Sequence, residues 1–414
     1  MFGTSDLVRR GARRTAVLLL VTLVSVSGNT SASAESVSPR PHQWYLEALN
    51  MEEAWAQSKG KGVTVAVIDT GVDSSLPELR GRLLKGRSFD DHSPDPHQDS
   101  NGHGTAMAAL IAGTGASGGA QGLAPEAQVL PLKAAMMGRG FWPGYEKAID
   151  YAVEQGAKVI NMSFGSAIPD GEEVQKAVDR ASKKGVLLFS GSGNEAMKGN
   201  KPTYPAVLPG VVGVGAVGEN GTVADFSSHG PQVSLAAPGT QMAVRCAKNK
   251  GWCRNDGGTS AASALASATA ALIWSANPDW TANQVLRVMI DTAGRPTEGK
   301  VPSRYVGYGV IRPKVALTRE DVDPGDPDKS PLFSKYYEKQ KASESPTPEP
   351  GEAQDDKAAG DDLAADKSPK TGATDGDTAS ESSNGTPLIA AGAGVALLLG
   401  AVATTVLIRR RRTS

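Results

Sequence analysis

The chain has 414 residues, with 43 Lys and Arg against 44 Asp and Glu, which gives a formal net charge of −1. A balance this close to neutral provides no electrostatic footprint for nucleic acid, so nucleic-acid binding is excluded as a leading function. The length leaves room for one large domain of about 280 residues, with further segments at both ends.

The first 34 residues are typical of an export signal. Four arginines precede an apolar stretch over 16–26, and Ala-Ser-Ala over 32–34 provides an A-x-A cleavage pattern. The apolar stretch is too short to span a bilayer, which takes roughly 20 residues. We therefore expect a signal peptide over 1–34, followed by an N-terminal extension over 35–62.

The central part alternates short apolar runs with glycine-rich turns and helical segments of small residues. This pattern indicates a parallel sheet covered by helices on both faces. Strands are expected at 63–68, 158–162, 186–190 and 211–215, and helices at 104–112, 145–155, 174–184 and 260–274. The predicted fold class is therefore α/β, a three-layer fold with a mostly parallel central sheet, in one domain over 63–318.

The composition changes twice after residue 318. Residues 319–386 are rich in Pro, acidic and small residues, which bury too little surface to offset their ordering entropy. They are expected to form a disordered acidic linker, either a plain spacer or an acidic docking tail. Residues 387–408 are uncharged, long enough to cross a bilayer, and followed by four arginines. The positive-inside rule then predicts that 409–414 lie in the cytoplasm and the domain outside. The alternative for 387–408 is a buried core helix.

Three motifs carry the chemistry of the domain. Asp69 lies in Val-Ile-Asp-Thr-Gly at a strand end, His103 in Asn-Gly-His-Gly-Thr, and Ser260 in Gly-Gly-Thr-Ser at a helix start. An alcohol becomes a nucleophile when a base takes its proton and a carboxylate orients that base. The three motifs together predict a serine hydrolase, and their order differs from the Ser, Asp, His order of α/β-hydrolases.

These motifs resemble those of the subtilisin-family serine proteases, the subtilases, and the resemblance spans the whole domain. It implies that Asp69 is the orienting acid, His103 the general base and Ser260 the nucleophile. Residues 190–195, Ser-Gly-Ser-Gly-Asn-Glu, are similar to the family segment that carries the oxyanion-hole asparagine, here Asn194. Its side-chain amide would donate to the oxyanion beside the backbone N–H of Ser260.

The resemblance also points to two substrate-binding segments. Asn-Met-Ser-Phe-Gly over 161–165 is similar to the family strand that pairs with the substrate backbone, and 190–192 lies close to Asn194 in sequence. Substrate-binding roles are therefore expected for Ser163, Phe164, Gly165, Ser190, Gly191 and Ser192. The sequence leaves open the preference for P1, the substrate residue before the scissile bond.

More closely, the chain is similar to mycosins, the membrane-anchored subtilases linked to type VII secretion in actinobacteria. Gln-Trp-Tyr-Leu over 43–46 leads directly toward the first strand, His-Gly-Thr-Ala over 103–106 has the mycosin form, and the C-terminal architecture agrees. The chain departs from the family at Ala261 and Ala264, where Met and Pro are usual. Neither position supplies a proton or a charge, so we expect the chemistry to be retained.

Two further features leave alternatives open. Cys246 and Cys253 are the only cysteines, and in an exported domain a pair indicates a disulfide, with two buried thiols as the alternative. The acidic and His-containing loop over 90–99 is either a metal site or, as we prefer, a loop that shapes the cleft beside His103. No metal and no cofactor are predicted.

These observations predict an extracytoplasmic serine endopeptidase, held in the cell membrane by a single C-terminal helix. It would hydrolyse a protein or peptide substrate through an acyl-enzyme. The mycosin resemblance implies processing of exported proteins at a type VII secretion system, with its membrane complex as a partner. The alternative is an assembly module whose subtilase fold stabilises that complex, with proteolysis secondary.

Overall fold

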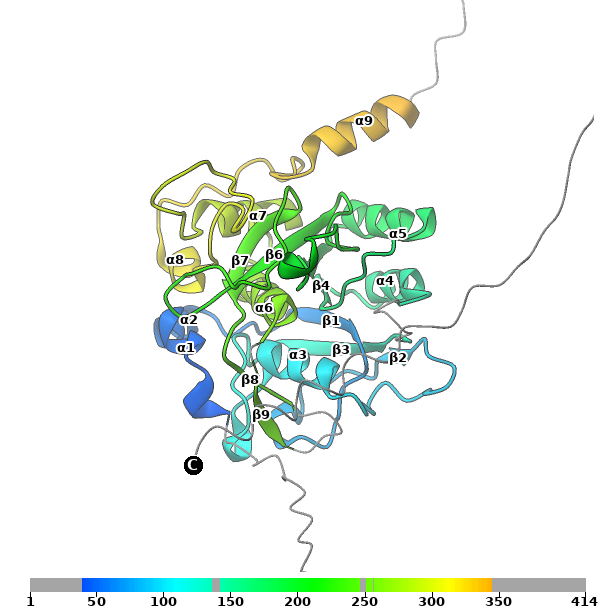
Figure 1. The fold of residues 1–414 in the computed structure, drawn as a ribbon, viewed down its shortest axis with the longest axis vertical. Coiled ribbons are helices and arrows are strands. Elements are labelled where there is room, and N and C mark those ends of the chain that lie inside the picture. The colour runs from blue at the N-terminus through cyan, green and yellow to red at the C-terminus, as the bar shows by residue number, and fades with distance from the viewer. Residues whose placement is uncertain (1–38, 136–141, 246–250, 256, 345–414) are drawn as a thin grey trace, which may run out of the picture. The chain divides into compact units, whose positions relative to one another are not determined.

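The computed structural model describes residues 39–135, 142–245, 251–255 and 257–344 (Figure 1). The expected signal peptide, membrane helix and cytoplasmic tail lie outside the described residues, and so does Cys246 of the expected disulfide. Within the described ranges, none of the helices combines the length and the apolar character needed to cross a bilayer.

A seven-stranded parallel sheet forms the centre of the domain, in the order β2-β3-β1-β4-β5-β6-β7. An antiparallel pair, β8 and β9, stands apart from it. The four predicted strands correspond to β1, β4, β5 and β6, each within two residues at either end. The strands are β1 (Thr64–Asp69), β2 (Arg87–Ser88), β3 (Gln128–Lys133), β4 (Val159–Met162), β5 (Leu187–Gly191), β6 (Val211–Val217), β7 (Val233–Pro238), β8 (Met242–Arg245) and β9 (Trp252–Asn255).

Helices cover both faces of the sheet, as predicted (Figure 1). The four predicted helices appear as α3, α4, α5 and α6, again within two residues at each end. The helices are α1 (Tyr45–Ala48), α2 (Met51–Gln57), α3 (His103–Ala112), α4 (Tyr145–Glu154), α5 (Glu172–Lys183), α6 (Thr259–Ala276), α7 (Ala282–Asp291), α8 (Pro313–Thr318) and α9 (Ser334–Glu344).

The two faces of the sheet bury separate apolar cores. Successive side chains of a strand point to opposite faces, so Val65 and Val67 of β1 pack in one core with α3 and α6. Ala66 and Ile68 pack in the other core with α4 and α5. Because both faces are covered, the strands are apolar without alternation, which confirms the α/β fold predicted from the sequence.

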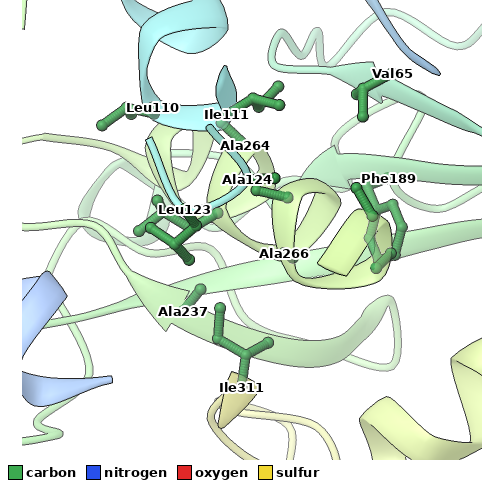
Figure 2. Packing of buried hydrophobic residues seen from close by; sticks show 14 of the residues in the cluster. Val65, Leu110, Ile111, Leu123, Ala124, Phe189, Ala237, Ala264, Ala266 and Ile311 are labelled. Atoms are coloured by element: carbon green, nitrogen blue, oxygen red, sulfur yellow. The ribbon is translucent and has the colours of Figure 1, made fainter. Parts of the chain in front are cut away.

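Helix α6 lies along the middle of one face, and its 18 residues are mostly alanine and other small residues. Figure 2 shows Ala264 and Ala266 of this helix within the core that also contains Leu110 and Ile111 of α3. Small side chains allow the helix to approach both α3 and the sheet closely. Ala264, where the family usually has Pro, is fully buried in this packing.

The N-terminal extension is part of the folded domain from residue 39 onward. The Gln43 side chain pairs with the main chain of Gln121, since Oε1 accepts from its N–H at 2.9 Å and Nε2 donates to its carbonyl at 2.8 Å. The indole N–H of Trp55 donates to the carbonyl of Leu123 at 2.7 Å. These bonds join the extension to the segment that precedes β3.

Residues 319–344 differ from the expected disordered linker, because they fold against the domain. The hydroxyl of Thr281 donates to the carbonyl of Pro327 at 2.9 Å, and Gln340 Nε2 of α9 donates to Asp179 Oδ2 at 2.8 Å. Phe333 packs on the main core. The reason is local: a few apolar residues precede the uniformly polar stretch, and the average composition over 319–386 hides them.

Candidate active site

Asp69 and His103 meet at the carboxyl edge of the sheet, where open α/β folds place their sites. Asp69 is the last residue of β1 and is fully buried, and His103 is the first residue of α3. The imidazole Nδ1 lies 2.8 Å from Asp69 Oδ1 and 3.0 Å from Oδ2. Burial alone would lower the pKa of His103, but the charge and hydrogen bond of Asp69 raise it above its usual value of 6.5.

Close packing of α3 on the end of β1 sets this pair. A Cβ built at Gly104 would lie 2.2 Å from the carbonyl oxygen of Gly71 and 3.0 Å from Asp69 Cβ. Only glycine therefore fits after His103 at this distance. The Asp69 carboxylate is itself fixed by the main-chain N–H of Thr70, which donates to Oδ1 at 2.8 Å.

Asp99 anchors the start of α3, a role that no motif in the sequence indicated. The residue before the helix, Gly102, has no side chain to cap it, and the buried Asp99 carboxylate takes that place. It accepts from the N–H groups of Gly102 (2.8 Å), Asn101 (3.1 Å) and Thr105 (2.9 Å), and from the hydroxyls of Thr105 (2.6 Å) and Thr70 (2.9 Å). This carboxylate belongs to the acidic loop that suggested a metal site, and its role here is to fix the loop to the start of α3 and to Thr70.

We expect Asp99→Asn to lower the free energy of unfolding by about 2–4 kcal/mol, because an amide offers one acceptor oxygen and turns an NH₂ group toward donors. Urea unfolding followed by circular dichroism measures the change. Asp91→Asn removes the same charge from an exposed position of the same loop and should change stability by less than about 0.5 kcal/mol. Equal losses in the two variants would contradict the anchoring role.

Ser260 is the second residue of α6 and is held by two reciprocal hydrogen bonds to Ser163, the residue that follows β4. The hydroxyl of Ser163 donates to the carbonyl of Ser260 at 2.8 Å, and the hydroxyl of Ser260 donates to the carbonyl of Ser163 at 2.7 Å. A hydroxyl has a single proton. In this rotamer the Ser260 proton is therefore given to the main chain and not to the imidazole of His103.

Asn161 fixes the contact between Ser163 and Ser260 by bonding to both Ser163 and α6. It is fully buried on β4, and its Nδ2 donates to the hydroxyl of Ser163 at 2.8 Å. Its Oδ1 accepts from Ser263 at 2.9 Å and from Ser267 at 3.2 Å, both on α6. A satisfied buried network of this kind sets the position of the helix along the strand. A buried Asn within an apolar strand was the signal in the sequence.

Asn194 lies at the same helix start. Its Oδ1 accepts from both the N–H and the hydroxyl of Thr259, each at 3.0 Å. The Nδ2 group faces the space that Gly258 leaves, since a Cβ built at Gly258 would lie 3.2 Å from it. The amide oxygen is thus held by α6, and the amino group is the part available for other acceptors.

A cavity of ≈ 360 Å³ opens beside these residues, and its lining includes Phe164, Gly165, Gly191, Gly193, Asn194 and Ser260. Ser163, whose hydroxyl bonds to the carbonyl of Ser260, is not in this lining, and neither are the expected pocket residues Ser190 and Ser192. Both are fully buried, and their hydroxyls contact the main-chain carbonyls of Phe164 (3.4 Å) and Ser228 (2.8 Å). Successive side chains of a strand point to opposite sides, and in this segment Gly191 and Gly193 face the cavity while the serine side chains point away from it.

Comparison with known proteins gives a consistent result. The sequence profile of the subtilase family matches residues 60–309. The chain is 35% identical over 281 residues to a thermostable alkaline protease of Halalkalibacterium halodurans, which covers 67% of this chain and 74% of that protein. It is 35% identical over 200 residues to thermitase of Thermoactinomyces vulgaris, covering 48% of this chain and 70% of thermitase.

Solved structures of mycosins are also similar to the domain. MycP1 from Mycobacterium smegmatis superimposes with a TM-score of 0.60 at 29% identity, over 69% of this chain and 86% of MycP1. The MycP3 protease of the type VII (ESX-3) secretion system gives a TM-score of 0.57 at 29% identity, over 67% of this chain and 88% of MycP3. These matches confirm the resemblance predicted from the sequence: the chain belongs to the subtilase family of serine proteases, and its structure is similar to those of mycosins.

Proposed function

We propose that this subtilase is an endopeptidase that uses Asp69, His103 and Ser260 as its catalytic triad. The observation that carries the proposal is the bond between His103 Nδ1 and the buried Asp69 carboxylate, with Ser260 at a helix start that shares its cavity with Asn194. The bonded Nδ1 carries the proton, so Nε2 is the basic nitrogen. A carboxylate, an imidazole and an alcohol so arranged perform acyl transfer.

The reaction begins when Ser260 leaves the carbonyl of Ser163 by rotation about χ1 and turns toward His103 Nε2. As Oγ attacks the scissile carbonyl, Nε2 takes the proton, and Asp69 stabilises the imidazolium. The proton then passes to the leaving amine, and an acyl-enzyme remains. Water then attacks this ester with His103 again as the base. The carboxylic acid product is released, and the Ser260 hydroxyl is regenerated.

The oxyanion of each tetrahedral intermediate would accept hydrogen bonds from Asn194 Nδ2 and from the N–H of Ser260. The first N–H groups of a helix have no partner within the helix and carry a partial positive charge, which favours an oxyanion there. The bond from Thr259 to Asn194 Oδ1 holds the amide in the required orientation. Preorganised donors of this kind stabilise charge that develops in the transition state.

We expect Asn194→Ala and Asn194→Asp to lower kcat by about 10²–10³, with a much smaller effect on KM. The aspartate keeps an acceptor oxygen for Thr259 and replaces the donor with a charged carboxylate oxygen, which also repels the oxyanion. Steady-state hydrolysis of a fluorogenic peptide measures both constants. Retention of kcat in Asn194→Asp would show that the residue acts only through Thr259. Asn220→Ala, at an exposed position, is the control for substitution as such.

The test of the function itself is labelling of the full chain, in non-ionic detergent, with a fluorophosphonate probe. Mass mapping should find the adduct on Ser260 alone, because only an activated hydroxyl attacks the phosphorus at a useful rate. Labelling that is spread over several serines, or that persists in the denatured chain, would contradict an activated Ser260. A folded chain without any label would leave the assembly role as the better explanation.

For the cellular setting, we propose a membrane-anchored protease that acts outside the cytoplasm on exported proteins. The similar MycP1 and MycP3 come from type VII secretion systems, and residues 387–408 followed by four arginines have the composition of an anchor. The linker over 345–386 would separate the domain from the membrane. A disulfide between Cys246 and Cys253, the second residue of β9, belongs to the same proposal.

A second candidate is the assembly module, and one observation favours it. The Ser260 hydroxyl is engaged with the Ser163 carbonyl rather than with His103, which is the geometry of a resting site. The similar MycP1 is described as an essential component of the type VII (ESX-1) secretion system. Secretion that persists in a Ser260→Ala strain and fails only when the whole chain is removed would support this role.

A further inference from the structure

The cavity beside Ser260 has an uneven distribution of charge. Next to Asn194, the short helix η5 (Ala196–Lys198) and the residues around it bring Glu195, Lys198 and Lys201 to the cavity lining. The opposite wall, from Phe164 to Ala167, has no charged side chain. If the site is a protease site as proposed above, this cavity receives the P1 side chain, and its charges then bear on which P1 residues are accepted.

Thr203 closes the cavity behind the glycines. Its side chain is 5% exposed, and a Cβ built at Gly165 or Gly193 would lie 2.3 Å from Thr203 Cγ2 or Oγ1, respectively. No side chain can therefore pass between these two glycines toward the interior. A P1 side chain that enters the cavity therefore stays within the lining that includes Lys201. Lys201 comes after the η5 helix and two residues before Thr203 in the sequence.

Two of the three charges compensate each other. Lys198 Nζ lies 3.5 Å from Glu195 Oε2, whereas Lys201 takes part in none of the ion pairs among the described residues. The cavity therefore has one uncompensated positive charge. A cleft lined by one sign of charge favours the opposite charge on a bound side chain and disfavours its own.

We propose that Lys201 determines specificity at this site: the P1 pocket accepts an acidic residue in preference to a basic one. The inference rests on the proposed protease function and adds the class of substrate to it. A glutamate carboxylate at P1 gains attraction to the Lys201 ammonium, and a lysine at P1 meets repulsion. Because Lys201 is exposed, solvent and salt reduce the effect, which should remain within about one order of magnitude.

The test compares four coumarin-amide peptides that share three alanines and differ only at P1, with Glu, Gln, Leu or Lys. The full chain in non-ionic detergent is used at low ionic strength. We expect kcat/KM for the Glu peptide to exceed that for the Lys peptide by about tenfold, with Gln in between. The ratio of the Glu to the Lys value should fall toward one in about 1 M salt, where the screening length is about 3 Å.

Two variants, one that removes a positive charge from the cavity and one that removes a negative charge, test whether the cavity charges determine the preference. Lys201→Met should lower the Glu-to-Lys ratio to about one, and Glu195→Gln should raise it about threefold, because Lys198 then loses its partner. Lys329→Met, an exposed lysine outside the cavity, should leave the ratio unchanged. A wild-type ratio at or below one, or a ratio that Lys201→Met does not change, would overturn the inference. If the charge inference fails but the Leu peptide is hydrolysed, the proposed protease function still holds. If no peptide is cleaved and the fluorophosphonate probe does not label the chain, both the inference and the protease function are overturned.

Discussion

Ser260→Ala should lower kcat for peptide hydrolysis about 10⁶-fold, the largest effect expected of any single substitution in this chain. The change removes the proposed nucleophile and leaves the proposed oxyanion donors and the cavity in place, so a residual rate about 10³ above the uncatalysed rate should persist. The substitution removes one partly exposed hydroxyl, which among the described residues donates to the Ser163 carbonyl, so stability should change by about 1 kcal/mol or less. Progress curves with concentrated enzyme and a fluorogenic peptide measure the residual rate.

The matched control is Ser275→Ala, which removes a hydroxyl from the other end of the same helix. That hydroxyl donates to the carbonyl of Lys61 at 2.7 Å and lies outside the cavity lining. Its loss should leave kcat unchanged. A Ser260→Ala protein that is folded and still hydrolyses peptides within tenfold of the wild-type rate would exclude the triad mechanism. Contamination by wild-type enzyme is recognised because a fluorophosphonate inhibitor would titrate it.

The sequence predicted the sheet and the places of the three proposed triad residues in it, because both depend on local patterns. Apolar runs bounded by glycine located β1, β4, β5 and β6, and the strand end and two helix starts located Asp69, His103 and Ser260. The sequence did not show the side chains that fix the exact approach of the helices, because their partners are distant in sequence.

Asn161 illustrates this limit. It bonds to Ser263 and Ser267, more than 100 residues away, and no pattern within β4 predicts those partners. Ser190 and Ser192 illustrate a second limit. Residues 190–192 were expected to bind substrate, but which residues of this segment face the cavity depends on the backbone turn at Gly193, with φ of 110°. Segment and function were thus predictable, whereas side-chain direction was not.

Asp69→Asn should lower kcat/KM about 10⁴-fold and move its acid limb to lower pH. The amide can donate to His103 Nδ1, which then holds the proton on Nε2, and the base is lost. Asp69 also raises the pKa of His103 above its usual value against the effect of burial, with Asp99 as a further negative group. If the neutral imidazole acts as the proposed base, wild-type activity should rise as the pH increases through this raised pKa. Removal of the Asp69 charge should lower the pKa of His103 and thus move the rise to lower pH.

The same raised pKa has a consequence for stability, whose sign is opposite to that for activity. A folded-state pKa above 6.5 means that the native protein binds the proton more tightly than the unfolded chain does. This contribution is fully present below about pH 6.5 and is lost as pH rises through the folded value. Asp69→Asn should remove it, so the stability difference between wild type and variant should be largest at low pH. Asp73→Asn, which neutralises a carboxylate in the turn after β1, should alter neither the pH profile nor this difference. If Asp69→Asn instead retains the wild-type acid limb, the carboxylate does not set the pKa of His103, and its role is limited to orienting the ring.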